Sequence, residues 1–185
     1  MSLISRVNSI LLIIDCQARL VPAMSGFPTV EANIIGMVQA ARLLHVPLRA
    51  TEHCPDKIGP TVDSIRERVQ QGEILSKTRF SGAAEPSIVD DLAQLERAQV
   101  VIAGIEAHVC VLQSAVGLLQ LDYQPFLVVD GVTSRSTSDK AIALKRLTEL
   151  GIQCVTTEMV LFEWLERGDT ADFKSIIPLI KRLKL

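Results

Sequence analysis

Cys110 is the residue of this sequence best placed to act as a nucleophile. It follows an apolar run at residues 100–105 and a short bend, where the pattern predicts the start of a helix. Unpaired backbone N–H groups and the positive end of the helix dipole favour the thiolate form of a cysteine in such a position. We therefore expect the thiolate of Cys110 to be stabilised and its sulfur to attack an electrophilic carbonyl.

Two charged residues, Asp15 and Lys77, also stand at the ends of apolar strands. Asp15 closes residues 10–14 and Lys77 closes residues 73–76. Each alone has an ordinary interpretation, a turn or helix cap for the aspartate and a solvated surface for the lysine. A phosphatase with an aspartyl nucleophile is disfavoured, because it would carry a second aspartate where this chain has Gln17. Together, the carboxylate, the ammonium group and the thiol indicate one site.

These residues are positioned by an alternation of apolar strands and segments of helical period. Such alternation is typical of an α/β fold, a parallel sheet with helices on both faces. The ligand crevice of an open sheet lies outside the carboxyl ends of its strands. The loops at residues 16–29, 52–60 and 78–84 follow three of those ends and are expected to set specificity. Strands are expected at residues 9–15, 46–51, 73–78, 99–105, 125–130 and 152–156, and helices at residues 30–45, 60–71, 85–96, 108–121 and 138–150.

The composition favours one domain with a small-molecule partner. The chain has 185 residues, 48% of them apolar, which suits a single domain over residues 1–185. Its 19 basic and 21 acidic residues give a formal charge of −2, so no nucleic-acid partner is expected. No leader-type segment and no run of about 18 apolar residues is present, which predicts a cytoplasmic protein without membrane contact. The basic amphipathic segment 173–185 predicts a packed or subunit-contacting helix, and we expect a homo-oligomer.

The other cysteines have less to indicate chemistry. No Cys-x-x-Cys spacing occurs, so neither a zinc knuckle nor a redox dithiol is predicted. Cys16 and Cys154 adjoin apolar strands and are expected to be small buried side chains, and Cys54 lies in a polar loop. His108 stands two residues before Cys110, where neighbouring side chains point in different directions. We therefore do not expect a Cys-His pair.

Three segments of the chain resemble the isochorismatase-like, or cysteine hydrolase, superfamily. They are Leu12-Ile-Ile-Asp15-Cys-Gln17, Ser76-Lys77-Thr-Arg-Phe80 and Gly104-Ile-Glu-Ala-His-Val-Cys110-Val111, in the order in which the family carries them. Within the family, the chain is similar to the small isochorismatase-domain-containing hydrolases. The resemblance implies a three-layer α/β/α Rossmann-like fold with a six-stranded parallel sheet of order 3-2-1-4-5-6. It also implies a catalytic triad of Asp15, Lys77 and Cys110.

The resemblance further implies how the reaction would proceed. Asp15 would take the proton of Cys110, and the thiolate would attack a small amide, carbamoyl or related acyl compound to form a thioester that water hydrolyses. A non-proline cis peptide is implied at Ile105-Glu106, and the backbone N–H groups of Glu106 and Cys110 would form the oxyanion hole. The residues expected to contact the substrate are Gln17, Phe80 and Ile105.

The chain also departs from better-defined members of that family. Nicotinamidases carry a metal site after the second strand, but the stretch from Thr51 to Asp56 lacks their ligand spacing, so neither a metal nor another cofactor is expected. Isochorismatases that cleave a vinyl ether lack a cysteine at the position of Cys110, and the thiol here argues against that reaction. The alternative to a hydrolase is a non-catalytic member of the same fold that binds a metabolite or a protein.

Overall fold

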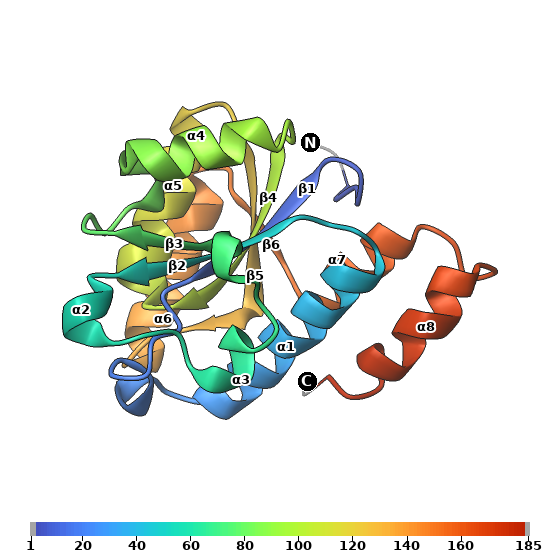
Figure 1. The fold of residues 1–185 in the computed structure, drawn as a ribbon, viewed down its shortest axis with the longest axis horizontal. Coiled ribbons are helices and arrows are strands. Elements are labelled where there is room, and N and C mark those ends of the chain that lie inside the picture. The colour runs from blue at the N-terminus through green and yellow to red at the C-terminus, as the bar shows by residue number, and fades with distance from the viewer. Residues whose placement is uncertain (1–2, 184–185) are drawn as a thin grey trace.

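The computed structural model describes residues 3–183 and is built around one sheet of six parallel strands (Figure 1). The sheet order is β3-β2-β1-β4-β5-β6, which confirms the expected fold class and order. All six expected strands are present, although β5 runs further than predicted. The strands are β1 Ser9–Ile14, β2 Leu48–His53, β3 Ile74–Lys77, β4 Gln99–Ile105, β5 Gln124–Thr133 and β6 Gln153–Val155.

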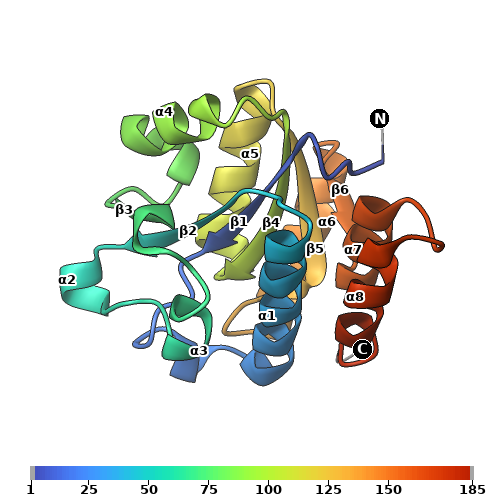
Figure 2. The same cartoon turned by 45° about the vertical axis from the view of Figure 1, so that its right-hand side comes forward.

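Helices cover both faces of this sheet (Figures 1 and 2). Helices α1 and α7 pack against one face, and α4, α5 and α6 pack against the other. The α-helices are α1 Phe27–Leu43, α2 Pro55–Ile58, α3 Asp63–Arg66, α4 Pro86–Gln94, α5 Leu112–Gln120, α6 Thr137–Glu149, α7 Thr157–Leu165 and α8 Ala171–Ile180. Short 3-10 turns lie at Val21–Ala23, Gln71–Glu73 and Gly82–Ala84, and a π-helical turn lies at Ala107–Val111.

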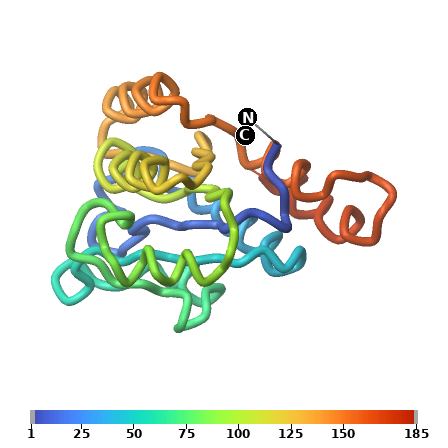
Figure 3. Tube along the Cα trace, turned by 90° about the horizontal axis from the view of Figure 1, so that it is seen from above, coloured from blue at the N-terminus to red at the C-terminus, as the bar shows by residue number. Residues whose placement is uncertain are grey.

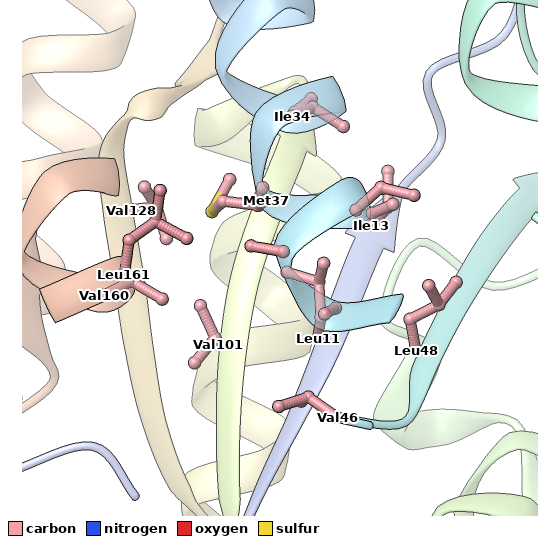
Figure 4. Packing of buried hydrophobic residues seen from close by; sticks show 14 of the residues in the cluster. Leu11, Ile13, Ile34, Met37, Val46, Leu48, Val101, Val128, Val160 and Leu161 are labelled. Atoms are coloured by element: carbon pink, nitrogen blue, oxygen red, sulfur yellow. The ribbon is translucent and has the colours of Figure 1, made fainter. Parts of the chain in front are cut away.

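The alternation of side chains along β1 divides the core into two layers. Leu11 and Ile13 join the layer beneath α1 and α7, and Leu12 and Ile14 join the layer beneath α4, α5 and α6. Successive residues of a strand point to opposite faces, so a central strand must be apolar throughout. All six residues of β1 are buried. Figure 4 shows part of the first layer, with Met37 of α1 among the side chains of the sheet.

Several helical segments differ from the prediction, including the single turn α2 within the expected loop at residues 52–60. The expected helix over residues 60–71 is only the single turn α3, because Thr61 pairs with Gln17 in an isolated antiparallel bridge that keeps the preceding chain extended. Helix α7 was not predicted from the sequence. Its buried side chains include Trp164, but Met159 and Phe162 are exposed apolar residues on the same helix. Apolar residues therefore lie on both the buried and the exposed sides of α7, so its sequence lacks the alternation of apolar and polar residues that predicts a helix.

The C-terminal helix α8 packs on α1 and α7, away from the sheet (Figure 3). The expected helix over residues 173–185 thus begins earlier, and its last two residues lie outside the described part of the chain. Within residues 3–183, no helix combines the length and the apolar character needed to cross a bilayer.

Candidate active site

The three strand ends singled out above meet at the carboxyl edge of the sheet. Asp15 directly follows β1, Lys77 is the last residue of β3, and Cys110 lies in the bend after β4. Strand β2 separates β1 from β3, and the lysine side chain spans that gap to place its Nζ 2.7 Å from Oδ2 of Asp15. A cavity of about 410 Å³ has Asp15 and Cys110 in its wall. The structure therefore brings the predicted carboxylate, ammonium group and thiol together.

Asp15 is fixed by its neighbours on β2. Its backbone has a left-handed conformation with φ of 53°, which turns the chain at the end of β1. The N–H of Asp15 donates to the carbonyl of Thr51 at 3.1 Å, and the Thr51 hydroxyl donates to Oδ1 at 2.7 Å. Oδ2 makes the contact with Lys77 without the alignment of a hydrogen bond. One carboxylate oxygen is thus anchored, and the other remains available as an acceptor.

Lys77 is a completely buried cation whose environment compensates its charge. The Nζ group contacts Asp15 and donates to the carbonyl oxygens of Arg79 and Phe80 at 3.2 and 3.1 Å. The two carbonyls accept hydrogen bonds from the ammonium group, and the carboxylate of Asp15 compensates its charge. The Lys77 and Asp15 side chains have no exposed surface, so each would be an uncompensated buried charge without the other.

The bend that carries Cys110 is built from left-handed residues and a π-turn. Gly104 has φ of +138°, and a Cβ at this position would lie 2.2 Å from the backbone oxygen of Ile14. Glu106 has φ of 56°. The prediction of a cis peptide at Ile105-Glu106 is wrong, because every peptide bond of residues 3–183 is trans. The chain instead turns at Gly104 and Glu106, which both have positive φ values.

The electrostatics of Cys110 also differ from the prediction. Burial, followed by the negative charge of Asp15 and a hydrogen bond with it, raises the pKa of the Cys110 thiol to about 12. Lys77 acts in the opposite direction through its charge and a hydrogen bond. Cys110 lies inside the π-turn Ala107–Val111, before α5 begins at Leu112, so it is not at the first turn of an α-helix. The resting side chain is therefore a neutral thiol beside a carboxylate.

The cavity beside Cys110 is lined by both apolar and polar side chains. The rings of His53 and Phe80 stack with centroids 5.2 Å apart. Phe80 remains 52% exposed at the cavity. The apolar wall consists of Leu20, His53, Ile58, Phe80 and Val109, and the polar wall consists of Asp15, Glu106, His108 and Arg135.

The polar wall is a small network around the Glu106 carboxylate. Arg135 donates its Nε to Oε1 of Glu106 at 2.8 Å, and its own side chain is 62% exposed. Nδ1 of His108 lies 3.0 Å from the hydroxyl of Ser134 and 3.6 Å from Oε2 of Glu106. His108 therefore faces the cavity from this network through Nδ1, and its Nε2 lies 3.9 Å from Oδ2 of Asp139.

Two residues expected to contact a substrate lie behind the cavity wall. Gln17 is fully buried, and its amide accepts from the N–H of His53 at 2.8 Å and donates to the carbonyls of His53 and Gly59 at 3.0 and 2.6 Å. Ile105 is also fully buried and belongs to β4. Neither lines the cavity. Gln17 acts by holding His53 at the end of β2.

Three residues around the site were not among the predicted site residues. Thr51 anchors Asp15, His53 forms the cavity wall, and Arg135 pairs with Glu106. Arg135 follows β5 by two residues, so the strand-end argument used for Asp15 could have found it. Cys54 lines a separate cavity on the far side of Lys77. Among residues 3–183, no group of three or more His, Cys, Asp or Glu side chains is arranged to hold a metal ion.

Known proteins resemble this chain in sequence and in fold. Residues 9–159 match the model of the Isochorismatase domain family. The isochorismatase domain-containing protein 2 of Danio rerio is 34% identical over 178 residues, covering 96% of this chain and 89% of the relative. The structure described as the MAR1 ribonuclease of Caenorhabditis elegans is 32% identical, with a TM-score of 0.91 over 97% of this chain and 93% of that one.

A more distant structure shares the fold. The YcaC gene product of Escherichia coli, described as an octameric hydrolase of unknown specificity, is 19% identical, with a TM-score of 0.90 over 99% of this chain and 95% of that one. The family match extends over the strand ends that carry Asp15, Lys77 and Cys110. The chain accordingly belongs to the isochorismatase family.

Proposed function

We propose that this protein is a cysteine hydrolase that cleaves the C–N bond of a small amide, carbamoyl or related acyl compound. The observation that carries the proposal is the buried pair of Asp15 and Lys77 in contact with the thiol of Cys110, with Asp15 and Cys110 in the wall of a cavity of about 410 Å³. A carboxylate beside a neutral thiol is a general base poised for its proton. The cavity volume suits a small molecule.

The first half of the proposed reaction forms a thioester. Because the pKa of Cys110 is raised, the proton should pass to Asp15 as the sulfur attacks the carbonyl carbon, and not beforehand. The backbone N–H groups of Glu106 and Cys110 are proposed to stabilise the resulting oxyanion. Asp15 then returns the proton to the departing nitrogen, so the C–N bond breaks and ammonia or an amine leaves. Lys77 keeps its charge and compensates the anions that form.

The second half consumes one water. Asp15 accepts a proton from water as its oxygen attacks the thioester, and the C–S bond breaks to give the carboxylic or carbamic acid. The proton then returns to the sulfur and restores the thiol of Cys110. Phe80 is proposed as part of the wall against which the substrate lies. No step requires a metal, so turnover should survive chelation.

Two other interpretations are distinguished by the same site. One relative is described as a ribonuclease, but the formal charge of −2 and the size of this cavity favour a small molecule over an RNA strand. A non-catalytic binding protein would have no use for a carboxylate and an ammonium group buried against a thiol. That costly arrangement favours the enzyme.

The test is ammonia release from a panel of primary amides, carbamoyl compounds and ureides, followed by intact-mass analysis of rapidly quenched samples. Turnover together with an acyl adduct on Cys110 is expected. The Cys110→Ala variant should lose both, since it lacks the nucleophile, and Asp15→Asn should lose turnover. Binding of panel members without turnover would favour the non-catalytic alternative, and full activity of Cys110→Ala would refute the mechanism.

A further inference from the structure

The Glu106 side chain is not accounted for by the reaction proposed above. It is 5% exposed, it lines the cavity, and its Oε1 accepts from Nε of Arg135. Its Oε2 is buried without a hydrogen-bond partner among the described residues. Nδ1 of His108 lies 3.6 Å from Oε2, beyond hydrogen-bonding distance, and is already in contact with the Ser134 hydroxyl at 3.0 Å.

A buried carboxylate oxygen in this condition is costly. An unsatisfied buried acceptor keeps its full desolvation penalty, and charged groups pay more than neutral ones. Arg135 engages only one of the two oxygens and is itself mostly exposed, so the ion pair alone does not account for burying the carboxylate. A hydrogen-bond donor that enters the cavity would remove the penalty. The terminal torsion of a glutamate is broad, so either oxygen can turn toward such a donor.

The charges around the cavity indicate that the donor belongs to a neutral molecule. Asp15 is balanced by Lys77, and Glu106 is balanced by Arg135. The thiol of Cys110 is uncharged at rest because its pKa is raised. A neutral ligand that donates through N–H leaves all of these pairs intact, whereas an added ion would leave one charge without a counter-charge.

We propose that the Glu106 carboxylate accepts a hydrogen bond from an N–H group of the substrate, and thereby selects primary amides, carbamoyl and ureido compounds over esters and ketones of the same shape. This inference rests on the proposed function, because the molecule concerned is the acyl substrate of Cys110. Glu106 has two separate parts in it. Its backbone N–H is proposed to face the carbonyl oxygen, and its side chain recognises the nitrogen.

The test compares two thiol-reactive probes of which only one carries an N–H donor. Acrylamide carries an NH₂ group where methyl acrylate carries OCH₃, and both react with a thiol by conjugate addition. The sulfur bonds to the β-carbon, the thiol proton ends on the α-carbon, and nothing leaves. The rates of addition to Cys110 are measured by peptide mapping, and each is divided by the rate with glutathione under the same conditions. The measured quantity is the acrylamide-to-acrylate ratio of these normalised rates.

For the wild-type protein we expect a ratio of about ten or more, the value of one hydrogen bond to a charged acceptor. Glu106→Gln keeps an oxygen for Arg135 but presents an NH₂ group in place of the second oxygen, so the ratio should fall to about one. Glu149→Gln is the matched control, because Glu149 is exposed on α6, and its ratio should equal that of the wild type. If Glu106→Gln does not fold, Glu106→Asp withdraws the carboxylate and should also lower the ratio.

A wild-type ratio near one, or an unchanged ratio in Glu106→Gln, overturns the role of Glu106. Neither result bears on hydrolysis, because conjugate addition needs only the thiol. Conversely, a high ratio without turnover of any amide in the panel would refute the hydrolase and leave the recognition of N–H donors by Glu106 standing.

Discussion

The alkylation rate of Cys110 in the resting protein should rise with pH far above neutrality. The thiolate is the reactive form, and burial with the charge of Asp15 raises the pKa of this thiol from its ordinary value of 9.0 to about 12. At pH 7 the thiolate fraction is then about 10⁻⁵, against about 10⁻² for an unperturbed thiol. The rate should increase about tenfold per pH unit up to pH 10, since the group stays below its pKa throughout.

Removing the charge of Asp15 should change alkylation and turnover in opposite directions. Asp15→Asn removes the charge that raises the pKa of Cys110 and leaves Lys77 with the thiolate as its nearest counter-ion. The pKa should fall, and one unit would speed alkylation at pH 8 about tenfold. Hydrolysis should nevertheless slow by about 10²–10⁴, because the amide cannot accept the proton of the thiol.

The assay is a set of quenched time courses with iodoacetamide from pH 7 to 10, with the modification at Cys110 quantified by peptide mapping. Asp122→Asn is the matched control, since Asp122 has a left-handed backbone with φ of 63° close to the 53° of Asp15, but lies in an exposed turn. Its profile should equal that of the wild type. A plateau below pH 9 in the wild type, or slower alkylation in Asp15→Asn, would refute the reasoning.

Three further outcomes follow from the packing. Lys77→Met should lower the free energy of unfolding by about 3–5 kcal/mol in urea titrations, because it leaves the buried carboxylate of Asp15 without a counter-charge. Adding Asp15→Asn should restore part of the lost stability. A Lys77→Met variant as stable as the wild type would contradict this. Gly104→Ala should prevent stable folding, since its Cβ would lie 2.2 Å from an oxygen of Ile14, whereas Gly151→Ala, with φ of +86° and open space around it, should cost about 1–2 kcal/mol in thermal melts. Sedimentation at micromolar concentration should show an oligomer, and a lone species of 20.2 kDa would count against it.

The location of the site could be predicted because strand ends are readable from sequence. Asp15 and Lys77 each close an apolar run, and the carboxyl ends of parallel strands share one edge of the sheet. That reasoning needs no knowledge of side-chain contacts. The same argument applied to the end of β5 would have pointed to Arg135, but β5 extends to Thr133 through a register shift that the apolar pattern does not reveal.

The state of the thiol could not be predicted in the same way. The sequence places Cys110 before a helix, which favours a thiolate, but it does not show how completely the fold buries the sulfur or that Asp15 lies against it. Nor does it show that the first turn is π-helical. Gln17 illustrates the same difficulty. A side-chain amide just after a strand end suggests a substrate contact, and only the structure shows that it is bonded to the backbone of His53 and Gly59.

The neutral resting thiol has a consequence for how the site is protected. Oxidation and unselective alkylation of cysteines follow thiolate character and exposure, and Cys110 is 5% exposed with a raised pKa. Lys77 lowers that pKa only in part, because its charge is already compensated by Asp15 and its Nζ is held by two carbonyl oxygens. In the proposed mechanism, activation therefore comes from the proton transfer to Asp15 that accompanies attack on a carbonyl held in the cavity. Under that proposal, the sulfur becomes a strong nucleophile at neutral pH only toward a molecule that the cavity has already positioned.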